Sequence, residues 1–119
     1  MSDYFGIDPA GLARLEKMGG PAFVKKMIDL FLKEAPERLD AARQGERAGD
    51  SAAVAIAAHS IKSSAQNFGA TSLSLIAEAI ERSARANDTK NLSKQLSDLE
   101  QAYSNAKSWL ESQRTKSPT

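Results

Sequence analysis

One histidine and one lysine are the side chains most able to do chemistry in this sequence. The chain holds a single histidine, His59, and between Asp50 and Glu78 the only formally charged side chain is Lys62, three residues later. In a helix, side chains three positions apart are neighbours on one face, so an imidazole and an ammonium would lie side by side. Because an imidazole can act as a nucleophile or a general base, this stretch is the first candidate for a functional site.

A helical wheel places His59 on the outer face of its helix. The apolar residues of the segment fall within roughly 40° of the opposite side of the wheel. These core candidates are Val54, Ala57, Ile61 and Phe68. The neighbours of His59 on the outer face are Ala55, Ile56, Lys62, Ser63 and Gln66. A face with small side chains, one aliphatic residue and little charge is typical of the centre of a docking surface.

The lysine fits one kind of chemistry in particular. Histidine can carry a covalent phosphoryl group, whose equatorial oxygens are negatively charged. The ammonium of Lys62, one helical turn away, would neutralise part of that charge. It would also disfavour a protonated imidazole, since like charges repel, and so keep a ring nitrogen available as the nucleophile.

Length and composition bound the remaining possibilities. The chain has 119 residues, which suits one domain, and its 41% hydrophobic and 26% charged residues are those of a globular protein. A net charge of +1 gives no basic excess for binding nucleic acid. Cysteine is absent, no segment is apolar enough to span a bilayer, and the N-terminus lacks a signal peptide. We expect a cytoplasmic domain.

The apolar spacing predicts helices throughout the chain, without strands. Asp8 and Asp50 are expected as helix caps, Gly69 as a helix terminator, and Pro36 as the cause of a kink rather than a break. The predicted helices span residues 8–18, 21–45 with the kink near Pro36, 51–68, 71–86 and 89–112. Residues 1–119 are therefore predicted to form one all-α domain, an antiparallel up-down four-helix bundle with a short N-terminal capping helix.

The residues around His59 resemble the signature of the histidine phosphotransfer (HPt) domain family. The signature has a histidine, lysine at +3, usually glycine at +4, small residues next and glycine at +10. Here these positions hold His59, Lys62, Ser63, 64–65 and Gly69. The segment 30–39, with Pro36, is similar to the family's preceding helix, so the resemblance covers nearly the whole chain. The one departure is Ser63, where glycine is more common.

The resemblance implies a phosphorelay intermediate without kinase or ATP-binding activity. His59 would accept a phosphoryl group on Nε2 from a receiver-domain aspartyl phosphate, in a hybrid histidine kinase or response regulator, and pass it to another receiver's aspartate. Lys62 would stabilise the phosphoryl oxygens. Ala55, Ile56, Ser63 and Gln66 would line the partner-binding surface, and Gly69 would be structural. The receiver would supply Mg²⁺, so no cofactor is expected on this chain, which we expect to be a monomer.

Three other interpretations have to be weighed against this one. A non-catalytic helical adaptor would not need His59 for partner binding. A hydrolase using His59 as general base would need an orienting carboxylate or a nearby nucleophile, and Ser63 is the one candidate nucleophile. A metal site is disfavoured because the sequence has no second histidine and no carboxylate close to His59.

Overall fold

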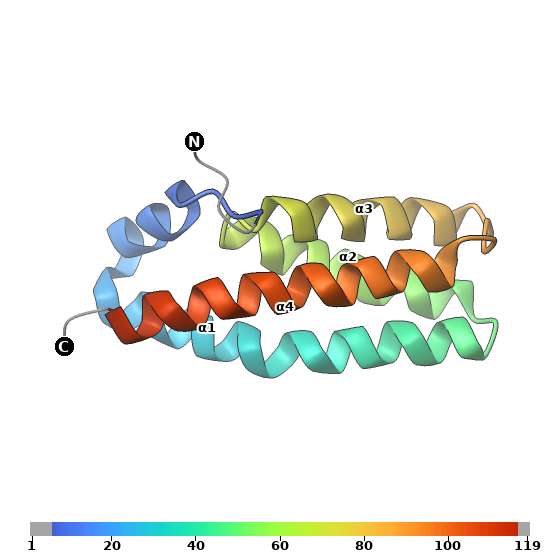
Figure 1. Cartoon of the computed structure of the whole chain (residues 1–119), viewed down its shortest axis with the longest axis horizontal. Helices are drawn as coiled ribbons and strands as arrows, with labels where there is room; N and C mark the ends of the chain where they lie inside the picture. The colour runs from blue at the N-terminus through green and yellow to red at the C-terminus, as the bar shows by residue number, and fades with distance from the viewer. Residues whose placement is uncertain (1–5, 117–119) are drawn as a thin grey trace.

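The computed structural model describes residues 6–116, and every regular element in that range is a helix. The four helices are α1 (Ala10–Arg47), α2 (Ser51–Asn67), α3 (Thr71–Arg85) and α4 (Leu92–Lys116). In Figure 1 successive helices run back and forth along the long axis of the molecule. α2 packs against α1 and α3, and α4 packs against the same two helices, so α2 and α4 lie on a diagonal.

The first two predicted helices are joined in α1, with a sharp change of direction at Gly20. Gly20 has φ 84° and ψ 177°, the non-helical backbone conformation within α1. A positive φ suits glycine because it has no Cβ to clash. The turns before Gly20 lie beside the junction of α2 and α3 (Figure 1). The backbone at Pro36 stays helical, so the interruption falls at Gly20, and a bend at Pro36 stays a prediction.

Local hydrogen bonds explain where α2 begins and ends. Asp50 is its N-cap, as the sequence predicts, with its carboxylate accepting a bond of 3.1 Å from the backbone N–H of Ala53. After α2 the chain turns at Gly69, which has φ +69°. A Cβ there would lie 2.4 Å from the carbonyl oxygen of Asp8, so glycine is required for the close approach of the N-terminal segment. At the start of α1 the cap position is held by Pro9 and not by the predicted Asp8, although Oδ1 of Asp8 accepts a hydrogen bond of 3.0 Å from the N–H of Ala10.

The later helices differ slightly from their predicted boundaries. α4 begins at Leu92 rather than at 89, and it extends to Lys116 rather than to 112. α3 begins at Thr71, as predicted. Ala70 occupies its cap position, and the Thr71 hydroxyl donates to the Gly69 carbonyl. Residues 1–5 and 117–119 of the predicted domain lie outside the described residues.

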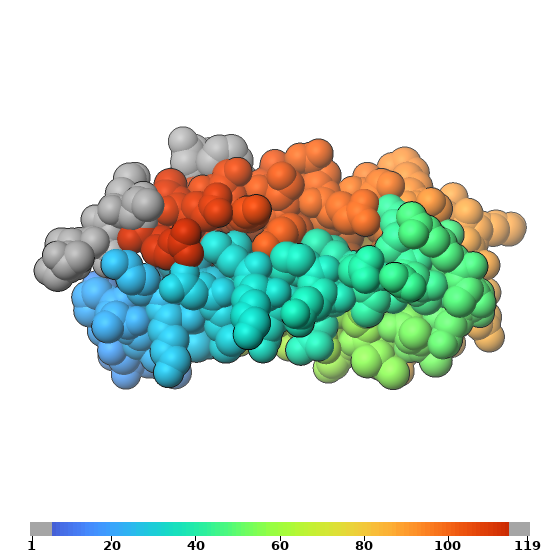
Figure 2. Space-filling model, turned by 90° about the horizontal axis from the view of Figure 1, so that it is seen from below, coloured from blue at the N-terminus to red at the C-terminus, as the bar shows by residue number. Residues whose placement is uncertain are grey.

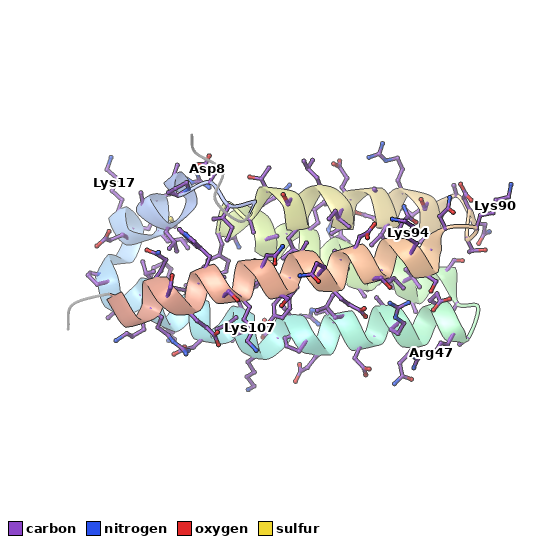
Figure 3. All side chains as sticks on the ribbon, viewed as in Figure 1. Asp8, Lys17, Arg47, Lys90, Lys94 and Lys107 are labelled. Atoms are coloured by element: carbon purple, nitrogen blue, oxygen red, sulfur yellow. The ribbon has the colours of Figure 1, made fainter. Side chains whose placement is uncertain are left out.

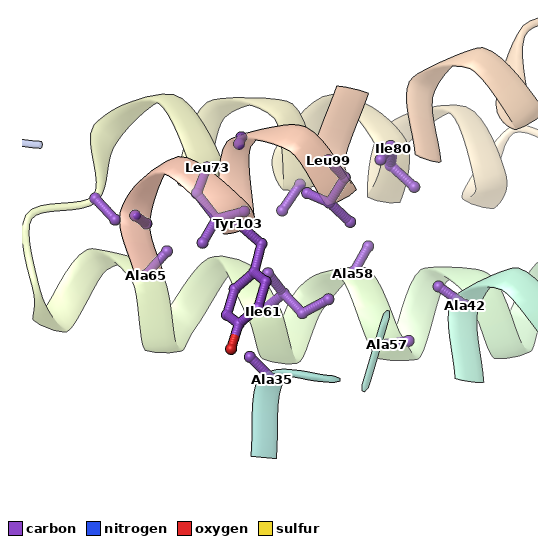
Figure 4. Packing of buried hydrophobic residues seen from close by; sticks show 14 of the residues in the cluster. Ala35, Ala42, Ala57, Ala58, Ile61, Ala65, Leu73, Ile80, Leu99 and Tyr103 are labelled. Atoms are coloured by element: carbon purple, nitrogen blue, oxygen red, sulfur yellow. The ribbon is translucent and has the colours of Figure 1, made fainter. Parts of the chain in front are cut away.

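The core combines small alanines with larger aliphatic side chains from all four helices. Figure 4 shows Ile61 and Leu73 in the interior near the ring of Tyr103, with Leu99 and Ile80 further along the bundle. The alanines of the core let the helix backbones approach closely. They include Ala35, Ala42, Ala57, Ala58 and Ala65, all at most 4% exposed. Figure 2 shows α1 and α4 lying against each other along the molecule.

Charged side chains extend outward from the bundle, as the labelled Lys17, Arg47 and Lys107 do in Figure 3. Within residues 6–116, no helix is both long enough and apolar enough to cross a membrane. The described structure is therefore an all-helical, four-helix fold that holds α2 between α1 and α3, and α2 carries His59.

Candidate functional site

His59 lies in the middle of α2 and points away from the core. Its side chain is 54% exposed, whereas Val54, Ala57, Ile61 and Phe68 are at most 4% exposed. The apolar face of the helix is thus fixed in the interior, and the opposite face must present the imidazole. The orientation predicted from the helical wheel is confirmed.

A carboxylate from α3 holds one of the two ring nitrogens. Nδ1 of His59 lies 3.0 Å from Oε2 of Glu81, a residue that is only 8% exposed. An ionised carboxylate can accept but not donate a hydrogen bond, so Nδ1 must carry the proton. The other ring nitrogen, Nε2, makes no hydrogen bond within the described residues. Its lone pair is available for reaction.

Two cations share the same carboxylate. Arg85, one turn further along α3, donates to Oε2 from Nε at 3.1 Å and from Nη2 at 2.8 Å. Lys62 Nζ lies 3.0 Å from Oε1 in an ion pair. Its alignment is not that of a hydrogen bond, and Oε1 has no hydrogen-bond partner among residues 6–116. We call His59, Lys62, Glu81 and Arg85 the histidine cluster.

The cluster keeps Glu81 ionised. Burial alone would raise the pKa of this carboxyl, but hydrogen bonding from Arg85, with the contacts to Lys62 and His59, outweighs burial and lowers the pKa from 4.5 to about 2. At physiological pH the carboxylate is therefore an acceptor for the imidazole and a counter-ion for both cations.

Three of the four residues predicted to line the docking surface are exposed. Ile56 is 67% exposed although it is aliphatic, and Ser63 and Gln66 are exposed on the same face as His59. Ala55 is 3% exposed, so it does not present its side chain at the surface, and its assignment to the partner-binding surface is corrected. Ala55 lies on the flank of the wheel on which Lys62 reaches Glu81, and that flank faces α3 rather than solvent.

The sequence-based interpretation missed Glu81, and it was wrong that no carboxylate lies near His59. A signal for the pair was present, because His59 and Glu81 are equally distant along the chain from Ala70, at the turn between α2 and α3. In a helical hairpin, residues equidistant from the turn lie opposite each other. A single carboxylate does not make a metal site, and within residues 6–116 no group of three or more potential ligands lies together.

Similarity to known proteins agrees with this arrangement. A family model described as "Hpt domain" matches residues 26–109, which is more than half of the chain and includes α2, α3 and the histidine cluster. The chain belongs to the Hpt domain family. Hpt domains are phosphotransfer carriers rather than kinases, and they interact with receiver domains in phosphorelays. A role in histidine phosphotransfer follows for this Hpt domain.

A solved structure extends the likeness of this Hpt domain to its fold. The crystal structure of histidine-containing phosphotransfer protein B (HptB) from Pseudomonas aeruginosa is similar with a TM-score of 0.89. The two chains are 24% identical, and the likeness covers 93% of this chain and 96% of the other. At this identity the likeness shows a shared fold. No curated protein matches the chain.

Proposed function

We propose that this Hpt domain is a phosphorelay intermediate in which His59 carries the phosphoryl group on Nε2. The observation that supports the proposal most directly is the half-exposed imidazole whose Nδ1 is held by Glu81 at 3.0 Å. That bond leaves the lone pair of Nε2 directed away from the carboxylate. The ring is both oriented and accessible, which an incoming aspartyl phosphate on another protein requires.

The transfer forms one bond and breaks one bond. The lone pair of Nε2 attacks the phosphorus of a receiver's aspartyl phosphate, and the leaving aspartate carboxylate keeps the electron pair of the broken P–O bond. Transfer to a second receiver reverses these events. Mg²⁺ would be held by the receiver and would neutralise the phosphoryl oxygens during each step. On this chain, neither a cofactor nor ATP is needed.

Lys62 is proposed to break its ion pair with Glu81 and then to stabilise the phosphoryl group on His59. Its side chain is 21% exposed and its contact with Oε1 is an ion pair without hydrogen-bond alignment. Rotation of the flexible lysine stem can bring the ammonium toward Nε2. Arg85 would meanwhile remain as the counter-ion of Glu81.

The docking surface of a receiver is proposed to centre on His59, Ile56, Ser63 and Gln66. Ile56 would supply apolar contact area, while the small Ser63 keeps the approach to the imidazole open. We propose that the domain works as a monomer in the cytoplasm. The donor would be a hybrid kinase or a response regulator, and the acceptor another receiver.

The test is incubation with a phosphorylated receiver domain and Mg²⁺. Wild type should acquire a label that is acid-labile and alkali-stable, as a phosphorus–nitrogen bond is, and His59→Gln should acquire none. Ser63→Ala should still be labelled, which excludes a serine ester. If several phosphorylated receivers leave the wild type unlabelled, the proposal is wrong. Intact signalling by His59→Gln would favour the adaptor instead.

A further inference from the structure

We propose that residues 6–19 form a latch that opens and closes over the α2–α3 turn by rotation about Gly20, and that the closed latch keeps the last turn of α2 in the form that a receiver binds. The structure shows the closed state, with the turns before Gly20 beside the junction of α2 and α3 (Figure 1). The latch precedes residue 26, where the match to the Hpt family model begins. Only its effect on receivers rests on the proposed function.

Backbone groups attach the latch to the turn. The N–H of Asp8 donates to the carbonyl of Gly69 at 2.7 Å, and the N–H of Ser72 donates to the carbonyl of Gly6 at 3.0 Å. Because Ser72 is in the first turn of α3, its N–H has no acceptor within its own helix. The carbonyl of Gly6 therefore satisfies a donor that would bond to water if the latch opened.

Close packing around one glycine completes the attachment. A Cβ on Gly11 would lie 2.4 Å from the carbonyl carbon of Phe68 and 2.5 Å from the backbone nitrogen of Gly69. Since these are backbone atoms, they cannot rotate away as a side chain would, and only glycine can dock in this place. Ile7 and Leu15 are buried beside it, at 0% and 6% exposure. The closed latch therefore depends on a specific fit at Gly11.

The remaining connections are weak enough for the latch to open separately from the bundle. Its exposed charged residues, Arg14, Glu16 and Lys17, form no ion pair or side-chain hydrogen bond within the described residues. Gly20 has φ 84° and ψ 177°, a backbone conformation that belongs almost to glycine alone. Apart from chain neighbours, nothing among residues 6–116 lies within 4 Å of the place of a Cβ there. An unpacked glycine between two helical segments can absorb the rotation of a hinge.

The closed latch supports the end of α2 that belongs to the docking surface. Phe68 and Gly69, on which Gly11 rests, directly follow the last turn of α2. The N–H of Gly69 donates to the carbonyl of Gln66 at 3.2 Å. Helix ends fray when the groups that bond their terminal carbonyls are free to move. Opening the latch would therefore loosen Gln66, whereas His59, about two turns earlier in the helix, would keep its place.

Hydrogen exchange followed by NMR tests the opening. In wild type the amide protons of Asp8 and Ser72 should have the same opening equilibrium constant, about ten-fold or more above that of Ile61 in the core. Gly11→Ala should raise the constant at Asp8 and Ser72 by about ten-fold or more and leave Ile61 unchanged, although alanine by itself favours a helix. Arg14→Ala, on the exposed side of the latch, is the matched control and should exchange as wild type does.

Ile7→Ala is the second variant, which keeps the test decisive if Gly11→Ala does not fold. It removes a buried side chain from the latch and should raise the opening constant of Ser72 as well. In either variant, transfer from a phosphorylated receiver should slow several-fold. Labelling of His59 by phosphoramidate, a small phosphoryl donor, should be unchanged because it does not need the docking surface.

Three results would each overturn the inference. One is an equal opening constant for Ser72 and Ile61 in wild type, which would make the latch part of a single cooperative unit. Another is a Ser72 amide that stays as protected in both variants as in wild type. The third is receiver transfer at the wild-type rate once exchange shows that the latch is open. Failure of the proposed function would be seen instead as wild type that no phosphorylated receiver labels, while Ser72 would still report the state of the latch.

Discussion

Two partly buried ionic clusters lie on different sides of this bundle, and they are built in opposite ways. Arg43 on α1 directs its guanidinium at α4, where it makes five hydrogen bonds: with Glu100, with the side chain and backbone of Ser93, and with Ser97. Every N–H of this arginine has an acceptor. In the histidine cluster, by contrast, Nε2 of His59 and Oε1 of Glu81 have no hydrogen-bond partner within the described residues.

This difference indicates that the Arg43 cluster has a structural role, linking two helices, whereas the histidine cluster is a reactive site. Arg43 is 16% exposed and its donors are used up, so it links α1 to α4 and has no capacity for another ligand. The buried ion of the histidine cluster is the acceptor Glu81, which orients a 54% exposed ring and leaves one nitrogen open. A polar cluster that is satisfied everywhere rigidifies the fold, whereas one that leaves a single accessible atom unsatisfied can react.

The largest expected effect concerns the pH dependence of stability, in which the two clusters should differ. The pKa of Glu81 is lowered from 4.5 to about 2 in the fold, so its contribution is fully present above pH 4.5 and is lost as pH falls toward about 2. It amounts to at most about 3 kcal/mol. Urea denaturation at a series of acidic pH values should show this loss in wild type and a smaller one in Glu81→Gln.

The matched control for this titration is Glu78→Gln, which removes an exposed carboxylate one turn away on the same helix. It should keep the acid dependence of the wild type. Identical pH profiles for wild type and Glu81→Gln would mean that Glu81 is not stabilised as an ion by its three partners.

Removing the Arg43 side chain should lower the stability of the fold without changing the rate of phosphotransfer to His59. Arg43→Ala leaves Glu100 in solvent contact and removes five hydrogen bonds, for an expected cost of about 2 kcal/mol in the free energy of unfolding. Phosphorylation of His59 by a receiver should proceed at the wild-type rate. Arg47→Ala, at an exposed position in the last turn of α1, is the control and should change the unfolding free energy little. A slowed transfer in Arg43→Ala would show that the two clusters are coupled.

Lys62→Ala should have the opposite effects, with stability retained and phosphotransfer slowed. The fold should be retained, because the pair with Glu81 is replaced in part by Arg85, while transfer from a phosphorylated receiver slows about ten-fold, or about 1.4 kcal/mol in the barrier. Rapid-quench measurement of labelled chain gives this rate. Lys107→Ala removes an exposed lysine from α4 and should be neutral. An unchanged rate in Lys62→Ala would remove this lysine from the mechanism.

The sequence was sufficient to predict the fold class and the orientation of His59, because both follow from the spacing of apolar residues along single helices. Val54, Ile61 and Phe68 mark one face of α2, and burying them turns the histidine outward. The features that the sequence did not predict depend on how neighbouring helices pack together. Ala55 is buried and Glu81 reaches Nδ1 because α3 lies against one flank of α2, and a wheel drawn for α2 alone contains no information on that flank.

The change of direction at Gly20 follows from local residues. Two glycines followed by Pro21 predicted the end of one helix and the start of another, and in the structure Gly20, with φ 84° and ψ 177°, is the non-helical point at which two helical segments of α1 meet. Local residue preferences locate such a point, but the packing of Gly11 against the Phe68–Gly69 backbone determines the direction that the first turns take.

The smallest predicted effect tests how open the reactive side of the molecule has to be. Ser63 lies one turn from His59 on the exposed face of α2, at a position where the family usually has glycine. Ser63→Phe should slow transfer from a receiver several-fold by obstructing its approach, but it should leave unfolding and labelling by the small phosphoramidate unchanged. Ser104→Phe, an exposed position on α4, which does not pack against α2, is the matched control. If Ser63→Phe slowed both kinds of labelling equally, the side chain would be disturbing the imidazole itself, and the docking surface would have to lie elsewhere around His59.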